Sequence, residues 1–221
     1  MRSTQAKRAR STQAKRARST TALLQGGVLP EGLLILRAAI GLLLVGHGTQ
    51  KLFSWYGGHG LDATAGMFEQ LGHRPGRRMA AIAGISEAGG GALLVLGLLT
   101  PLAAAMLMGT MLVAALSVHA QQGLWNTNGG YELPLTYGLI ACVLGFTGAG
   151  AWSIDHVAGI PWTSGAGPGL SAVILAYIAS AITLARRTRV LESAAQGAYP
   201  AEPEPVLTDP AVADREADLN A

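Results

Sequence analysis

Four long apolar stretches, each about the length of one membrane crossing, constrain the fold of this chain more than any other feature. They cover residues 32–52, 79–99, 102–120 and 133–149. A helix needs about 20 apolar residues to cross a hydrocarbon core of about 30 Å. The composition agrees, because 13% of the residues are charged, whereas soluble domains carry about 25%. The sequence therefore predicts an all-α polytopic membrane bundle with a four-helix core over residues 32–157.

A shorter apolar run at residues 170–184 predicts a fifth transmembrane helix when it is extended to 168–187. Such a helix starts at a proline, ends among arginines and is about 30 Å long. The distribution of Lys and Arg favours four crossings instead, because a fifth crossing puts seven basic residues inside against eight outside. We favour five crossings, with four as the alternative.

The charged residues are concentrated at the two ends of the chain. Residues 1–21 hold seven Lys/Arg and no acid, and they contain an octapeptide that starts at Arg2 and repeats from Arg10. Two copies are too few for a repeat fold, and this composition cannot bury a core. We predict a disordered basic leader at 1–21 and a disordered acidic tail at 188–221. The basic leader predicts that the N-terminus lies in the cytoplasm, beneath the plasma membrane.

Ionisable residues inside the apolar stretches indicate a candidate site. A charge at membrane depth costs roughly 2.5–3.5 kcal/mol, so such residues usually face the interior of a bundle. With a cytoplasmic N-terminus, five of them converge on the outer half of the bundle: His47, Lys51, Glu87, His119 and Glu132. The sequence therefore predicts a polar pocket in that half.

Glu87 is predicted to pair with Lys51 or His47, because small residues around it let a neighbouring helix approach closely. These small residues are Gly84, Ala88, Gly90 and Gly91. Two interpretations are open: an ion pair that only sets the helix register, and a pocket that binds a redox-active or anionic small molecule. Near the opposite membrane surface, Arg37 and Asp155 are predicted to form a structural ion pair.

Other kinds of site find little support. The single cysteine, Cys142, excludes an internal disulfide and a CxxC redox pair. His47 and His119 are candidates for haem ligation between helices, but nothing in the sequence enforces it. No HExxH motif, P-loop or Ser-His-Asp order is present. We therefore expect no metal and no covalently bound cofactor. The basic residues lie in a leader rather than on a folded face, which argues against nucleic-acid binding.

Six short motifs carry a family resemblance. They are GHGTQKLF at 46–53, GGHGL at 57–61, AGISEAGG at 83–90, LGLLTPL at 96–102, GGYELPL at 129–135 and WSID at 152–155. Together they resemble the DoxX family of small bacterial integral membrane proteins over about residues 33–157. The resemblance departs at residues 148–150, where Gly-Ala-Gly stands in place of the usual Gly-Pro-Gly. The positions that match the family motifs are His47, Gln50, Lys51, Glu87, Glu132 and Asp155.

The resemblance implies a role in membrane redox chemistry. Relatives are subunits of thiosulfate:quinone oxidoreductase, or partners of superoxide dismutase and a sulfurtransferase in thiol and oxidative-stress defence. We therefore expect a membrane subunit of an oxidoreductase complex, with quinone as a ligand and soluble redox proteins or a second copy of the chain as partners. A small transporter for an anion or a proton, and a scaffold that anchors soluble redox enzymes, are the alternatives.

Overall fold

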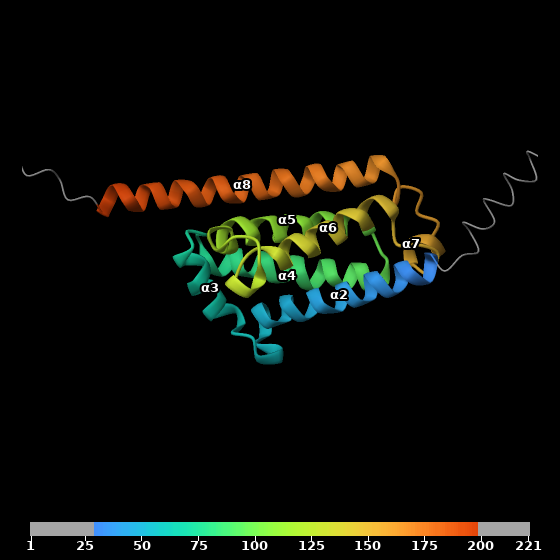
Figure 1. Cartoon of the computed structure of the whole chain (residues 1–221), viewed down its shortest axis with the longest axis horizontal. Coiled ribbons are helices and arrows are strands. Elements are labelled where there is room, and N and C mark those ends of the chain that lie inside the picture. The colour runs from blue at the N-terminus through green and yellow to red at the C-terminus, as the bar shows by residue number, and fades with distance from the viewer. Residues whose placement is uncertain (1–28, 199–221) are drawn as a thin grey trace, which may run out of the picture.

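The described part of the chain, residues 29–198 of a computed structural model, is an all-α bundle without strands (Figure 1). Five helices run along its length: α2 (Leu29–Phe53), α4 (Gly76–Leu96), α5 (Thr100–Ala114), α6 (Glu132–Thr147) and α8 (Ala166–Ala198). A π-helical turn at Ala115–His119 and a 3-10 turn at Ala120–Gln122 extend α5. The predicted leader and the tail beyond residue 198 lie outside the described residues.

Within residues 29–198, four helical segments are long and apolar enough to cross a membrane: Leu29–Phe53, Gly76–Leu96, Thr100–Gln122 and Ala166–Gly197. The predicted fold class, a polytopic membrane helical bundle, is therefore confirmed. The shorter apolar helix α6 has 16 residues, which corresponds to about 24 Å at about 1.5 Å per residue. Many large apolar side chains on the outside of the bundle are more than half exposed, as lipid-facing residues are; they include Ile35, Leu42, Ile82, Leu139 and Ile174.

Helix α8 is longer than the sequence predicted, because it continues through residues 188–198 instead of ending near Arg187. Leu, Glu, Ala and Gln in this segment favour helix. Contacts with the loop after α3 also hold the helix there: Arg187 Nε donates to the carbonyl of Leu71 at 2.8 Å, and Leu191 packs over Gly72. The first part of the predicted disordered tail is therefore helical.

The link between α4 and α5 lies at residues 97–99, so α5 starts at Thr100, two residues before the apolar stretch predicted at 102–120. Gly97 ends α4 with a left-handed conformation, φ 60°, which glycine adopts without steric cost. Pro101 falls in the first turn of α5, where a missing backbone N–H costs nothing. Proline therefore starts the second helix here and does not form the turn.

Glycines bring α2 and α4 into backbone contact. A Cβ atom on Gly41 would lie 2.6 Å from the carbonyl oxygen of Gly91, and one on Gly48 would lie 2.5 Å from that of Gly84. Helix α5 lies at the centre of the bundle and packs on α4, α6 and α8. Leu107 of α5 belongs to a buried core cluster that also includes Leu44 of α2, Leu94 of α4 and Leu144 of α6. The absence of side chains at these glycines allows the short distance between α2 and α4.

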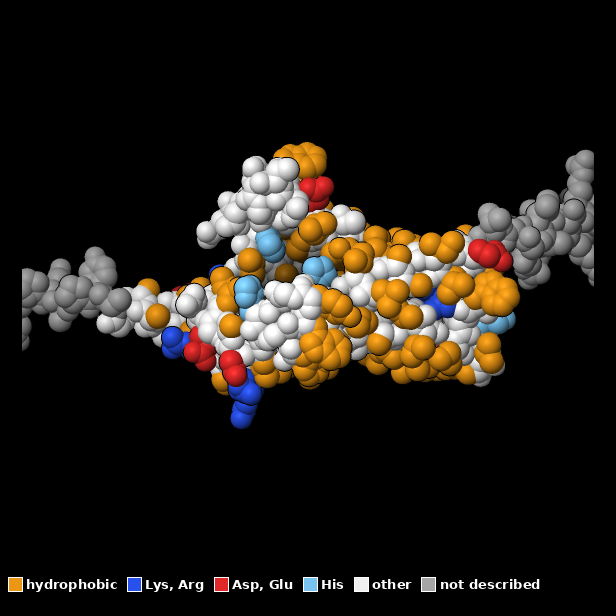
Figure 2. All heavy atoms as spheres, turned by 90° about the horizontal axis from the view of Figure 1, so that it is seen from below, with side chains coloured by type: hydrophobic (Ala, Val, Ile, Leu, Met, Phe, Trp, Pro, Cys, Tyr) orange, Lys and Arg blue, Asp and Glu red, His pale blue; other side chains and the backbone are white. Residues whose placement is uncertain are grey.

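Two short helices cover the ends of the bundle. Helix α3 (Gly60–Gln70) packs on α4 and α2 at the end that carries Lys51, and α7 (Ile154–Val157) lies at the other end, near the start of α2 (Figure 1). Figure 2 shows many hydrophobic side chains along the bundle, whereas charged side chains and histidines lie towards its two ends, most of them near the α3 end. We refer to these two ends as the Lys51 end and the Arg37 end.

Candidate functional site

The Lys51 end contains an ion pair between two helices. Lys51 Nζ, in the last turn of α2, donates to Glu87 Oε2, in the middle of α4. The Glu87 side chain is 4% exposed and that of Lys51 is 26% exposed. Each residue lies three positions after one of the touching glycines, Gly48 and Gly84. Because residues three apart share a helix face, the glycine contact brings the two side chains together.

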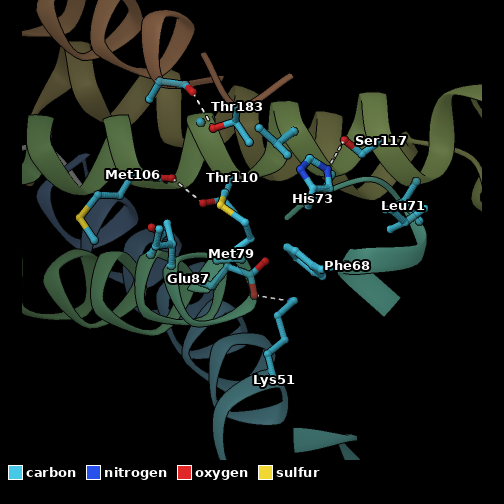
Figure 3. Close-up of a pocket in the computed structure, with 18 of the residues that line it drawn as sticks. Lys51, Phe68, Leu71, His73, Met79, Glu87, Met106, Thr110, Ser117 and Thr183 are labelled. Atoms are coloured by element: carbon cyan, nitrogen blue, oxygen red, sulfur yellow. Dashed lines mark hydrogen bonds and ion pairs between the residues drawn. The ribbon is translucent and has the colours of Figure 1, made fainter. Parts of the chain in front are cut away.

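A cavity of about 520 Å³ lies beside this pair, walled by α3, α4, α5 and α8 (Figure 3). Most of the wall is apolar, and Phe68 of α3 and Met79 of α4 lie close to the ion pair in Figure 3. Two of the wall hydroxyls, on Thr110 and Thr183, donate to backbone carbonyls of their own helices. Lys51 and Glu87 are therefore the charged groups that a molecule in this cavity would meet.

His73 forms a second polar contact in the cavity wall. It lies in the loop between α3 and α4, and its Nε2 is 2.9 Å from Ser117 Oγ. Both side chains are buried. Burial lowers the pKa of His73, and the nearby positive charge of Arg187 lowers it further. The imidazole is therefore neutral near pH 7 and acts as a hydrogen-bonding group, not as a cation.

Sequence reasoning missed His73, since no motif or apolar periodicity surrounds it. The contact depends on the π-helical turn Ala115–His119, which rotates the end of α5 and holds Ser117. Turns of this kind are rare and occur frequently at functional sites.

The structure brings together only part of the predicted cluster. His119 lines the cavity, and its Nδ1 donates to the carbonyl of Gly129 at 2.6 Å. The exposed His47 lies on the flank of α2 beside Tyr137 of α6, with ring centroids 6.2 Å apart. His47 therefore contacts α6 and does not line the cavity that Lys51 reaches.

Gln50 and Glu132 organise loops outside the cavity. Gln50 Nε2 donates to the carbonyl of Tyr56 at 3.2 Å, and Glu132 Oε2 accepts from the backbone N–H of Asn126 at 2.9 Å. Of the five residues in the predicted cluster and the further pocket candidate Gln50, the cavity wall therefore contains Lys51, Glu87 and His119.

The predicted ion pair between Arg37 and Asp155 does not form directly. The Arg37 guanidinium donates to the carbonyls of Leu94 and Val95, at the end of α4, and to that of Trp152. Neither ion pair found within residues 29–198 includes Arg37. The cation instead adds hydrogen bonds to carbonyls in the last turn of α4, where the Leu94 carbonyl also accepts from the backbone N–H of Gly97.

Asp155 binds the start of the next helix. Its carboxylate accepts from the backbone N–H of Leu99 at 2.8 Å and of Thr100 at 3.0 Å, and from the Thr100 hydroxyl at 2.6 Å. An anion at a helix N-terminus and a cation at a helix C-terminus both complement the helix dipole. Arg37 and Asp155 therefore stabilise the tight α4–α5 link, at the end of the bundle away from the Lys51–Glu87 pair.

Cys142 lies in a separate apolar groove between α5, α6 and α8 and is half-buried there. That groove shares no lining residue with the cavity beside Lys51. Within residues 29–198, no three His, Cys, Asp or Glu side chains lie close enough together to hold a metal ion.

The comparisons with known proteins agree with the motifs that carry the pair. Residues 32–120 match the family model described as DoxX. No curated protein and no solved structure matches the chain. The matched segment runs from α2 to the π-helical turn after α5 and includes Lys51, His73, Glu87 and His119. The chain is therefore a membrane protein by its apolar helices, and its segment 32–120 is similar to the DoxX family.

Proposed function

We propose that this protein is a membrane subunit of quinone- or thiol-linked redox metabolism and that its cavity binds the head of a quinone. The observation that carries the proposal is the buried Lys51–Glu87 pair in the wall of an apolar cavity of about 520 Å³. Small-molecule sites typically enclose about 300–1,000 Å³ and combine an apolar wall with a few placed polar groups. A quinone ring, which is flat and apolar with two carbonyl acceptors, fits this combination.

The side chains of the wall have distinct roles in this proposal. A bound quinone supplies the electron-accepting ring. The Lys51 ammonium has three N–H donors, of which Glu87 takes one, so another is free to donate to a ring carbonyl. Glu87 is placed to exchange a proton at the same position. His73 and Ser117 close the wall as a neutral hydrogen-bonded pair.

A partner protein is the proposed source of electrons, because the single Cys142 provides no dithiol within the chain. The family resemblance points to soluble partners of the superoxide dismutase or sulfurtransferase type. Under this proposal, this protein contributes the membrane site, and the complex carries out the reaction.

Quinone binding tests the proposal directly. We expect quinone to co-purify with the wild-type protein in mild detergent, and Lys51→Met and Glu87→Gln to weaken its binding about tenfold or more. A hydrogen bond to a charged group is worth about 1.5–3 kcal/mol, which corresponds to that loss. Cys142→Ala, in the separate groove, should bind like the wild type. Mass spectrometry of extracted quinone and titration with added quinone measure both quantities.

Three other results would contradict the proposal. Equal binding by all four proteins would place quinone elsewhere. Flux of an anion or a proton through proteoliposomes, without quinone binding, would support the transporter. A stable soluble partner with neither activity would support the scaffold.

We also propose that the N-terminus is cytoplasmic in the plasma membrane, so that the Lys51 end faces outward. The seven basic residues of the leader support this orientation, whereas six arginines at the Lys51 end favour the reverse: Arg74, Arg77, Arg78, Arg186, Arg187 and Arg189. In a Cys142→Ala background, an impermeant maleimide added to intact cells should label a cysteine at His59 and leave one at Ala158 unlabelled. The reverse pattern would invert the orientation.

A further inference from the structure

The cavity beside the Lys51–Glu87 pair runs along much of α5. Its lining includes Leu102 and Ala105 near the start of this helix and Ser117 and His119 in the turn that follows it. At about 1.5 Å per residue, residues 102–119 correspond to about 25 Å. The ionic pair and the His73–Ser117 pair contribute polar groups to the wall, and the part near Leu102 is apolar. The cavity is therefore elongated, with an uneven distribution of polar groups.

Helix α3 and the loop after it cover the cavity at the Lys51 end. Met67 and Phe68 of α3 line the wall, and so do Leu71 and His73 of the following loop. Figure 3 shows Phe68, Leu71 and His73 on the side of the cavity nearest this end. The segment is anchored on both sides, because α3 packs on α4 and the carbonyl of Leu71 accepts from Arg187 of α8. This cover closes part of the cavity at the Lys51 end, where the Glu87 side chain is 4% exposed and that of Lys51 is 26% exposed.

The side of the cavity facing the bilayer is less closed. Helices α4 and α8 both pack on α5, and they make few contacts with each other. Ile82 of α4 and Leu175 of α8 each line the cavity and are each 56% exposed. Ala179 of α8 also lines the cavity and is exposed. Apolar side chains of α4 and α8 therefore border a gap between the two helices. Through this gap the cavity faces the region where lipid acyl chains would lie.

Resting on the proposed function, we propose that the gap between α4 and α8 is a lateral portal for tailed, lipid-soluble quinones. The polar head lies beside Lys51 and Glu87, and the apolar tail passes between Ile82 and Ala179 into the bilayer. Because the edges of the gap are apolar, the tail can remain in an apolar environment while the head enters the cavity. The portal residues then select ligands by their tails, separately from the groups that hold the ring.

A bulky side chain in the portal tests the route. We expect Ala179→Trp to weaken binding of a quinone with a long isoprenoid tail by about tenfold or more, the scale of overpacking a filled site. Binding of a tail-free quinone with the same ring should stay within about twofold of wild type, because its ring lies beyond the portal. Ala181→Trp is the matched control, because Ala181 is exposed on the same helix and does not line the cavity. All proteins are measured in lipid nanodiscs.

A second measurement separates failure of the portal from failure of the proposed function. A phospholipid with a photoreactive acyl chain should label cavity-lining peptides around Met106 and Gly109 in the wild type and in Ala181→Trp, but not in Ala179→Trp. Absence of this labelling in the wild type, or equal loss of both quinones in Ala179→Trp, would overturn the portal even where quinone binds. Labelling that Ala179→Trp blocks, in a protein that binds neither quinone, would support a membrane portal and reject the quinone function.

Discussion

Replacing Gly48 by alanine is expected to destabilise the protein by about 3 kcal/mol, at the upper end of the cost of adding atoms to a packed core. The new methyl group would lie 2.5 Å from the carbonyl oxygen of Gly84 and against the backbone of Ala88. Backbone atoms cannot rotate out of the way as side chains can, so α2 and α4 must move apart. Thermal unfolding in detergent should show a much lower melting temperature, and the Lys51–Glu87 contact should be lost.

Gly46→Ala is the matched control on the same helix. A Cβ atom at Gly46 meets nothing within 4 Å, and alanine favours helix over glycine by about 1 kcal/mol. We therefore expect Gly46→Ala to be neutral or slightly stabilising. If both variants melt at the wild-type temperature, α2 and α4 are not in backbone contact at Gly48 and Gly84.

Removing one member of the Lys51–Glu87 pair is expected to cost about 3–5 kcal/mol, the usual penalty for leaving an uncompensated buried charge. Lys51→Met should be the more damaging change, because it strands the 4%-exposed Glu87 carboxylate inside the bundle. After Glu87→Gln, the longer and more exposed Lys51 side chain can extend its ammonium towards the membrane surface. The expected order of melting temperatures is wild type, Glu87→Gln, then Lys51→Met.

The double variant Lys51→Met/Glu87→Gln should recover much of the loss, since no unpaired charge remains. The exposed pair of Arg77 and Asp62 provides a control, with side chains that are 65% and 84% exposed. Its single variants should each change stability by less than about 1 kcal/mol. Additive losses at Lys51 and Glu87 would show that these two side chains do not interact.

The double variant also separates stability from ligand binding. If the double variant has the stability of the wild type but has lost quinone binding, the ion pair contributes to ligand binding. Near wild-type stability together with unchanged quinone binding would show that the pair sets helix register only, which is the structural alternative raised by the sequence.

The apolar helices could be predicted from the sequence because hydropathy is a local property. In the hydrocarbon core, a stretch of about 20 apolar residues forms a helix, because a helix satisfies its backbone hydrogen bonds internally. Its apolar side chains then contact lipid or other helices. The cost of a charge at membrane depth likewise singled out Lys51 and Glu87 before any partner was known. The glycines around Glu87 predicted a close helix approach, and the structure has one at Gly48 and Gly84.

Which polar residues meet was decided by tertiary structure. His47 and Lys51 are four residues apart on one helix, yet only Lys51 lines the cavity, because His47 lies beside Tyr137 of α6. Arg37 and Asp155 are near each other, but the helix ends at the α4–α5 link offer each a closer backbone partner.

His73 joins the site through contacts distant in sequence, with Ser117 of the π-helical turn and beside Arg187 of α8. The length of α8 was also hidden from hydropathy, since its last turns are polar and are held by contacts with the loop after α3. Composition and helical periodicity determine which segments cross the membrane. The packing of particular glycines, helix ends and loops determines which side chains share a cavity, because those contacts join residues far apart along the chain.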